Sequence, residues 1–297
     1  MIERASGERR GERTGIPIDL VSPALRSIMT AEDYSRVRHE VPYTFVLENT
    51  RKNKQISYFG ARHTSNPKNP QFKAIETAFN TANPDIVFIE GVSGREKSSG
   101  FGEQVRALTR EQAIHTMGEP GFTAKLAVEK GIEWNSPEPS DEILYSFLLV
   151  SGFSKEQIFA WHVLRALSQY GREPKREGFE AYAQRGIKGF QRTTDWQGFD
   201  YSYKHALDLG EQISGTGIDV ENCPNAGDLT DPIPWVSKRD QQTVLNRVAE
   251  KSTLFRDRQI VTDIMRALET HRRGFIVYGA SHAVMQEPAL KMALDTL

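Results

Sequence analysis

The stretch DIVFIEG, at residues 85–91, is a near-continuous apolar run that ends in an acid and a glycine. Such a run is typical of a strand that is buried on both faces of a parallel sheet. Before it, NPQFKAIETAFNTANP (69–84) spaces its apolar residues at helical intervals, and Asn83-Pro84 ends that helix because a residue before proline avoids the α region. QISYFG (55–60) is rich in β-branched and aromatic residues and predicts a strand. Strand, helix and strand together predict a βαβ unit with a right-handed crossover.

The regular pattern continues on both sides of this unit. YTFVLEN (43–49) is expected to form a hairpin with QISYFG through the polar turn RKNK. The later part of the chain predicts helices at about 101–115, 122–130, 236–271 and 285–295, a GEPG turn at 118–121, a short strand within 131–139 and a last strand at 274–279. The fold class is therefore α/β, with a mixed, mainly parallel sheet and flanking helices.

Three regions of different character divide the chain. Residues 1–38 mix charged residues with glycine and serine and predict a flexible leader, with one short helix around Pro23–Met29. Residues 39–297 predict a single α/β domain that contains a large helical insertion at about 140–235. The insertion is rich in aromatic residues, which form either a lid or pocket wall or simply the core of the insertion.

Composition excludes several classes of protein. The 38 basic side chains face 39 acidic ones, so nothing favours nucleic acid, whose binding needs a concentrated positive surface. The single cysteine, Cys223, permits neither an intrachain disulfide nor a cysteine-based zinc site. The N-terminus lacks the apolar stretch of a signal peptide, and no run approaches the ~18 apolar residues of a membrane span. We expect a cytoplasmic protein with no membrane or nucleic-acid partner, and the sequence leaves the oligomeric state open.

Two copies of one short motif flank the predicted core. ISYFGARH (56–63) and FIVYGASH (275–282) each give an apolar strand, an aromatic residue and then Gly-Ala-x-His. A glycine at the end of a strand permits a sharp turn. The histidine three residues later then lies above the carboxyl edge of the sheet, where open α/β sheets bind their ligands. His63 and His282 are therefore predicted to share an active site.

Glu90 ends the strand in DIVFIEG at the same predicted edge. A carboxylate there is costly unless it is paired, solvated or bound to a metal. Two histidines and a carboxylate are a common set for Mn, Co, Zn or Fe, so His63, Glu90 and His282 are candidate metal ligands. The same three side chains also work without metal, with one histidine as general base and the glutamate orienting it. Alternatively, Glu90 caps the next element or pairs with Arg95 or Arg62.

Further candidates surround these three. Arg258, in LFRDRQIVTDIMRAL, is placed to reach His282 from a late helix, although a solvated arginine is the ordinary alternative. Glu119 is expected mainly to cap a helix, whereas Glu138 is open between capping and function. The candidate substrate-binding residues are Arg62, Glu119, Glu138 and Ser281.

These motifs resemble a superfamily that joins the TraB/PrgY pheromone-shutdown proteins, the Tiki metalloproteases and the erythromycin esterases. The resemblance covers residues 55–290 and consists of Gly60-Ala61-Arg62-His63, Glu90 in IVFIEG, Arg258 in DRQIVTDIM and Gly279-Ala280-Ser281-His282. It implies a mixed α/β core with a helical insertion. Tiki-like members imply a divalent-metal-dependent peptidase, and erythromycin esterase-like members imply a histidine base that opens a lactone without metal. This chain departs from both groups, because it shows no membrane anchor and its insertion has no recognised match. Arg256 is an alternative to Arg258 as the functional arginine.

The sequence therefore predicts a hydrolase that activates water against an amide, ester or lactone in a peptide or small molecule. His63, Glu90 and His282 bind a divalent ion, or one histidine acts as base, while Arg258 stabilises the developing oxyanion or holds a substrate carboxylate. The alternative is a non-catalytic protein that sequesters a small molecule, a peptide or haem. A third reading is a cyclisation or dehydration performed by the same residues.

Overall fold

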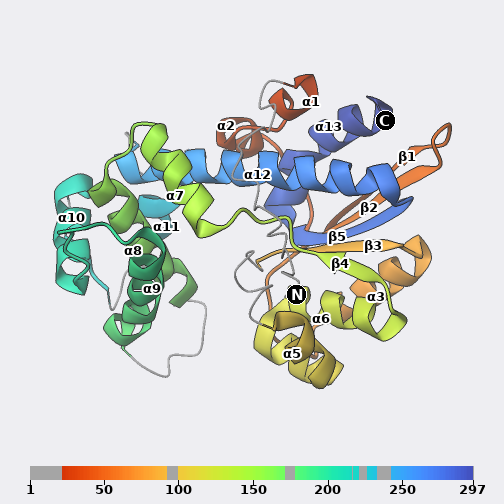
Figure 1. Ribbon diagram of the computed structural model, residues 1–297, viewed down its shortest axis with the longest axis horizontal. Helices are drawn as coiled ribbons and strands as arrows, with labels where there is room; N and C mark the ends of the chain where they lie inside the picture. The colour runs from red at the N-terminus through yellow and green to blue at the C-terminus, as the bar shows by residue number, and fades with distance from the viewer. Residues whose placement is uncertain are drawn as a thin grey trace, which may run out of the picture.

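In the computed structural model, a five-stranded sheet forms the centre of one half of the molecule, on the right in Figure 1. The structure describes residues 22–91, 100–170, 178–215, 217–220, 226–232 and 242–296. The strands are β1 (Tyr43–Asn49), β2 (Lys54–Ala61), β3 (Ile86–Ile89), β4 (Glu133–Asn135) and β5 (Arg273–Gly279), in the spatial order β1-β2-β5-β3-β4. β1 runs antiparallel to β2, and all other neighbours are parallel. The predicted hairpin and the mixed, mainly parallel sheet are confirmed.

Alternate residues of the inner strands bury opposite faces of the sheet. Val87, Ile89 and Val277 pack on one face with α3 (Gln71–Ala82) and α6 (Arg110–Lys130). Ile86, Phe88 and Ile276 pack on the other face with α12 (Val244–Thr270) and α13 (Ala280–Thr296). Burial of both faces explains why these strands are continuous apolar runs, whereas the edge strand β1 alternates in exposure.

The order of the strands brings distant parts of the chain together. The β2-α3-β3 unit leaves one position open between its two strands, and β5 fills this position from the far end of the chain. β2, β5 and β3 are parallel neighbours, so their carboxyl ends lie side by side. The residues that follow these three strands are therefore placed at one edge of the sheet.

The helices differ from the predictions at two places that matter for this edge. The expected turn at 118–121 is instead a kink in α6, where Gly118 has φ 61° and ψ −141°, and the helix resumes at once. The closing helix begins at Ala280, directly after β5, rather than near residue 285. His282 therefore stands in the first turn of a helix and not in a loop. A short helix α5 (Phe101–Ala107) precedes α6.

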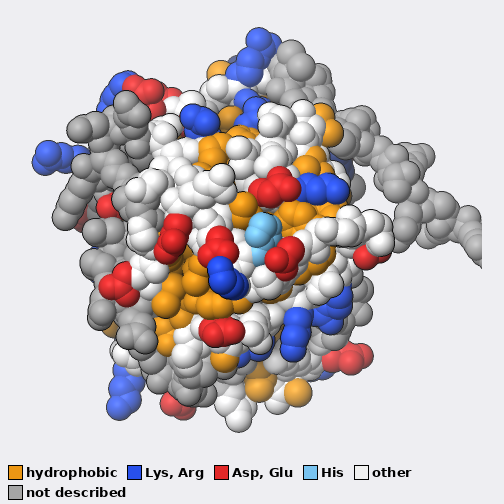
Figure 2. Space-filling view, turned by 90° about the vertical axis from the view of Figure 1, so that its left-hand side faces the viewer, with side chains coloured by type: hydrophobic (Ala, Val, Ile, Leu, Met, Phe, Trp, Pro, Cys, Tyr) orange, Lys and Arg blue, Asp and Glu red, His pale blue; other side chains and the backbone are white. Residues whose placement is uncertain are grey.

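The predicted helical insertion forms a lobe beside the sheet, drawn in green to cyan in Figure 1. We call α7 (Asp141–Val150), α8 (Lys155–Tyr170), α9 (Phe179–Thr194), α10 (Tyr203–Ser214) and α11 (Ala226–Thr230) the helical lobe. The lobe packs around a core of its own, to which the first turns of α12 also contribute. Many of the insertion's aromatic residues are buried in that core, which supports the structural interpretation for most of them. Figure 2 views the molecule from this side and shows apolar side chains gathered among acidic and basic ones.

The described part of the segment before β1 contains two short helices. α1 (Pro23–Arg26) and α2 (Ala31–Ser35) lie against α13, and Leu25 and Ile28 join the core on that face of the sheet. The short helix expected around Pro23–Met29 is confirmed in α1, whereas the expected flexible leader contains two packed helices from residue 23 onward. Residues 1–21 lie outside the described residues. In the described ranges, no helix combines the length and the apolar character that crossing a membrane requires.

Candidate active site

His63 follows β2 and stands at the carboxyl edge of the sheet with its side chain 54% exposed. Its two ring nitrogens face two different carboxylates. Nδ1 lies 3.4 Å from Glu119 Oε2, and Nε2 lies 3.8 Å from Glu90 Oε2. The hydrogen bond to Glu119 and the charge of Glu90 outweigh partial burial and raise the pKa of His63 above its ordinary value.

Glu119 anchors the loop that carries His63. It is 3% exposed, and its Oε1 accepts hydrogen bonds from the Thr64 backbone N–H at 2.6 Å and from Gln71 Nε2 at 3.1 Å. The kink at Gly118 directs this carboxylate toward the loop. The expectation that Glu119 mainly caps a helix is therefore wrong: the carboxylate binds a loop of another part of the chain.

Glu90 lies at the centre of the site. Its Oε2 accepts a hydrogen bond from the Gly279 backbone N–H at 2.6 Å, which fixes the carboxylate against the end of β5. Its Oε1 lies 3.7 Å from His282 Nε2 and 3.8 Å from Arg256 Nη2. Both histidines thus present Nε2 to the same carboxylate, and the predicted convergence of His63, Glu90 and His282 is present in the structure. Arg95, the other suggested partner of Glu90, lies outside the described residues.

His282 is the buried member of the pair, with its side chain 10% exposed. Its Nδ1 lies 2.6 Å from Asp257 Oδ1, which also accepts a hydrogen bond from Gln286 Nε2 at 2.7 Å. Gln286 in turn accepts from the hydroxyl of Tyr58 at 3.0 Å. Burial alone would lower the pKa of His282, but the charge and hydrogen bond of Asp257 and the charge of Glu90 raise it to about 9. His282 is therefore protonated at neutral pH.

Arg256, and not Arg258, is the arginine of this site. Its Nε and Nη2 donate to the two carboxylate oxygens of Glu138 at 2.9 and 2.8 Å. Burial opposes the charge of Glu138, but Arg256 outweighs it and lowers the pKa of that carboxyl. Arg258 lies two residues further along α12, about 200° around the helix from Arg256. Among the described contacts, none joins Arg258 to either histidine, whereas Arg256, the alternative named from the sequence, lies beside Glu90 and Glu138.

The remaining predicted residues occupy the rim of the site. Arg62 has an exposed side chain, and its backbone N–H and C=O are both held by the side-chain amide of Gln71. Ser281 is half-buried in the first turn of α13. Glu138 is 6% exposed and fully engaged by Arg256, so it supports the arginine rather than capping a helix. Asp257 and Gln286 are part of the site although the sequence analysis did not select them.

Two glycines set how closely the two motifs approach each other. A Cβ on Gly60 would lie 2.8 Å from both Ala283 Cβ and the Tyr43 carbonyl oxygen, atoms that move only if α13 or β1 moves. A Cβ on Gly279 would lie 3.0 Å from His63 Nε2 and 3.5 Å from Glu90 Oε2. Gly60 therefore permits packing of the sheet against α13, and Gly279 makes room for the site.

We expect Gly60→Ala to lower the free energy of unfolding by about 1–3 kcal/mol, because overpacking displaces well-packed atoms. Gly279→Ala is expected to cost less than ~1 kcal/mol, since the half-exposed ring of His63 can move aside, but to displace that ring. The matched control is Gly189→Ala in α9, where a Cβ meets nothing within 4 Å and helix propensity predicts a gain of ~0.5–1 kcal/mol. Urea unfolding of the three variants is the measurement, and a Gly60→Ala variant as stable as Gly189→Ala would contradict this account.

The raised pKa of His282 predicts how stability depends on pH. A pKa of about 9 in the folded protein, above the ordinary 6.5, stabilises the fold fully below pH ~6.5. This stabilisation is lost as pH rises through 9 and His282 loses its proton. We expect thermal unfolding between pH 6.5 and 10 to show a steeper fall for the wild type than for His282→Gln, which has no titrating ring. Equal slopes for the two proteins would mean that His282 is not held as a cation by Asp257.

The residue types at this edge are ones that bind divalent ions, but their side chains are not arranged around a common point as metal ligands are. Imidazoles whose Nδ1 is held by a carboxylate are usual metal ligands, and both His63 and His282 have this arrangement. Within the described part of the chain, however, no three His, Cys, Asp or Glu side chains form a group that could hold a metal ion. The positive charges beside Glu90 Oε1 are the protonated ring of His282 at 3.7 Å and the guanidinium of Arg256 at 3.8 Å.

The comparisons with known proteins add no relative to this description. No protein-family model, no curated protein and no solved structure matches the chain. The function of the protein is therefore inferred from the geometry of the site.

Proposed function

We propose that the protein is a hydrolase that activates water at the His63–Glu90–His282 edge against an amide, ester or lactone. One observation carries the proposal: two imidazoles are each anchored through Nδ1 by a buried carboxylate and each present Nε2 to Glu90. A side chain held in one tautomer by a carboxylate, with its other nitrogen aimed at a shared space, is the arrangement of a general acid or base.

The different exposures of the two histidines suggest different roles. His63 is half-exposed, so water and substrate can reach its Nε2. As base it takes a proton from water while the water oxygen attacks the carbonyl carbon, and it then returns that proton to the leaving oxygen or nitrogen. Glu119 stabilises the imidazolium that forms in between and holds the ring in place.

His282 and Arg256 supply the positive charge of the site. His282 is protonated at neutral pH, and Arg256 is charged at any pH that the fold survives. Both lie within 4 Å of Glu90 and so hold its carboxylate in place. Their charges favour the negative charge that develops on a carbonyl oxygen during attack. Stabilisation of the oxyanion, predicted from the sequence for Arg258, is here proposed for Arg256 together with His282.

A divalent ion is an alternative version of the same proposal. Held by His63, Glu90 and His282, it would lower the pKa of bound water to near ~7 and polarise the carbonyl group. The metal-dependent version is the one that the resemblance to Tiki-like peptidases implies. The metal-free version is the one that the resemblance to erythromycin esterases implies.

The non-catalytic alternative is less well supported. A haem site needs an axial donor above a flat apolar slot, whereas Nε2 of both histidines faces the carboxylate of Glu90. A cyclisation or dehydration by the same residues is distinguished from hydrolysis by mass analysis of the product.

The test combines a substrate panel with metal analysis. The wild type is assayed on a p-nitrophenyl ester, on dihydrocoumarin as a lactone and on a peptide p-nitroanilide, and its metal content is measured by plasma mass spectrometry beside His63→Gln and His282→Gln. Turnover by a metal-free wild type supports the histidine-base hydrolase. A stoichiometric ion that both variants lose supports the metal version. A folded wild type that turns over none of the three substrates, with or without added Mn, Co, Zn or Fe, would count against a hydrolase.

A further inference from the structure

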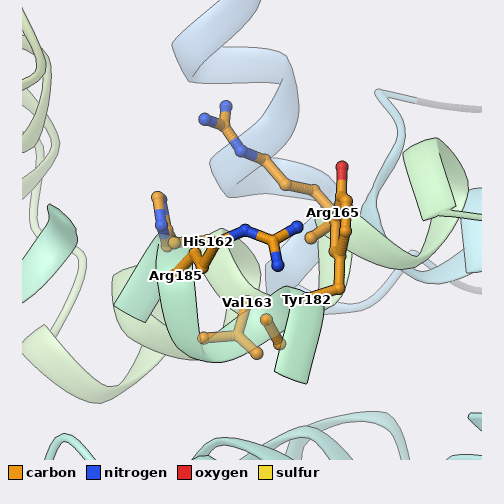
Figure 3. A pocket seen from close by; sticks show the side chains of 8 residues that line it. His162, Val163, Arg165, Tyr182 and Arg185 are labelled. Atoms are coloured by element: carbon orange, nitrogen blue, oxygen red, sulfur yellow. The ribbon is translucent and has the colours of Figure 1, made fainter. Parts of the chain in front are cut away.

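A cavity of about 320 Å³ lies between α8 and α9 in the helical lobe (Figure 3). Its lining comes from residues 162–166 of α8 and 182–186 of α9, none of which belongs to the site at the sheet edge. The small residues Ala166, Ala183 and Gly186 leave this space open between the two helices. Its volume falls in the range of roughly 300–1,000 Å³ that is usual for small-molecule sites.

The charged groups of this cavity are arginines. The guanidinium of Arg165 stacks over the ring of Trp161 at 4.6 Å, and that of Arg185 lies 5.3 Å from the ring centre of Tyr182. Figure 3 shows the side chain of Arg185 lying between His162 and Tyr182. None of the described residues that line the cavity is acidic. Stacking on the ring of Trp161 orients the guanidinium of Arg165 and leaves the N–H donors at its edge available for a carboxylate.

His162 contributes a neutral wall to the cavity. Its Nδ1 lies 2.8 Å from the hydroxyl of Tyr145. Burial, together with the nearby charge of Arg165, lowers the pKa of His162 to about 3. The positive charge at the cavity therefore comes from Arg165 and Arg185, and not from His162.

We propose that this cavity is a second binding site, which takes a small organic anion: a carboxylate carried on a compact apolar body. The carboxylate pairs with Arg165, and the apolar part contacts Val163, Ala166 and the ring of Tyr182. A guanidinium matches a carboxylate through two parallel N–H donors, and the apolar wall accepts the rest of the molecule. This site is independent of the proposed hydrolysis, because it shares no residue with it.

Isothermal titration calorimetry with 4-phenylbutyrate and its neutral amide, 4-phenylbutyramide, tests the proposal on the full chain. We expect the wild type to bind the carboxylate at least about ten-fold more tightly than the amide, since charge-assisted pairing adds ~1.4 kcal/mol or more. Arg165→Gln is expected to remove this preference, and Arg165→Lys, which keeps the charge, to retain part of it. Lys204→Gln, at an exposed pair on α10, is the control for a general loss of positive charge.

His63→Gln separates the two sites, because a carboxylate could also be drawn to the arginine at the sheet edge. Carboxylate binding that survives His63→Gln and fails in Arg165→Gln supports the cavity. Three outcomes would overturn the proposal: no carboxylate binding at millimolar concentration, equal affinity of the wild type for acid and amide, or a preference for the carboxylate that survives in Arg165→Gln.

Discussion

Glu138→Ala is expected to lower the free energy of unfolding by about 3 kcal/mol, the lower end of the range for breaking a buried ion pair. Glu138 is 6% exposed and accepts two hydrogen bonds from Arg256, whose side chain is 25% exposed. Removing the carboxylate leaves a guanidinium that is largely cut off from water, with Glu90 at 3.8 Å as a weaker partner. Because Arg256 is partly exposed and keeps Glu90 as a second partner, the expected loss of unfolding free energy lies at the lower end of the range for buried ion pairs.

Two controls identify the unpaired charge as the cause. Lys204→Ala breaks the exposed pair with Asp208 on α10 and is expected to leave the free energy of unfolding nearly unchanged, because solvent screens the pair. The double variant Glu138→Leu/Arg256→Met replaces the pair by apolar side chains and is expected to be more stable than Glu138→Ala alone. Urea unfolding gives all three values. A Glu138→Ala variant as stable as Lys204→Ala, or a double variant no better than the single one, would mean that the pair does not hold this edge together.

The strand ends could be predicted from the sequence for a definite reason. DIVFIEG and GFIVYG are buried on both faces, so each is an uninterrupted apolar run with a clear end, and parallel neighbours place their ends together. His63, Glu90 and His282 follow directly from those ends. The pairing of β5 with β2 on one side and β3 on the other joins residues about 200 positions apart, and no local sequence pattern encodes it.

Arg258 was predicted instead of Arg256 because the side of α12 that faces the site was not identified from the sequence. Asp257 lies on the same stripe as Ile260, Val261, Ile264 and Leu268, a spacing of three, four, seven and eleven residues, and all five are buried. An acid on the apolar stripe of a helix is a signal that could have been found. It identifies Asp257 as the buried partner, but Arg256 and Arg258 lie about 100° to either side of it. The choice between the two arginines is therefore set by the tertiary contacts of Arg256 with Glu138 and Glu90, which the helix pattern does not encode.

Glu119 was misjudged because glycine and proline suggested a turn. A proline is tolerated in the first turn of a helix, so Pro120 fits directly after the kink and α6 continues. The kink instead presents the carboxylate to the backbone of Thr64 and to His63, contacts between segments about 55 residues apart. Local sequence shows that the chain bends at Gly118 but not which loop the bend faces.

His63→Gln is expected to lower kcat/KM by about 10²–10⁴ on whichever ester, lactone or amide the wild type hydrolyses, the usual contribution of a general base. Glutamine keeps a polar side chain of similar reach at this half-exposed position, so the fold should be preserved. His271→Gln, at the opposite edge of the sheet beside the start of β5, is the matched control and should leave kcat/KM unchanged. Equal activity of the two variants would rule out His63 as the base.

The pH profile then separates catalysis by His63 from a merely structural role. A base acts in its neutral form, so kcat/KM of the wild type should rise with pH through the raised pKa of His63, and should fall near pH 9 as His282 loses its proton. Glu119→Gln removes the carboxylate whose hydrogen bond is the main cause of the raised pKa of His63. The rising limb of this variant should therefore move to lower pH, while its fall near pH 9 stays in place because Asp257 is intact. A rising limb that does not move in Glu119→Gln would show that the activity is not governed by the proton of His63 and would contradict its assignment as the base.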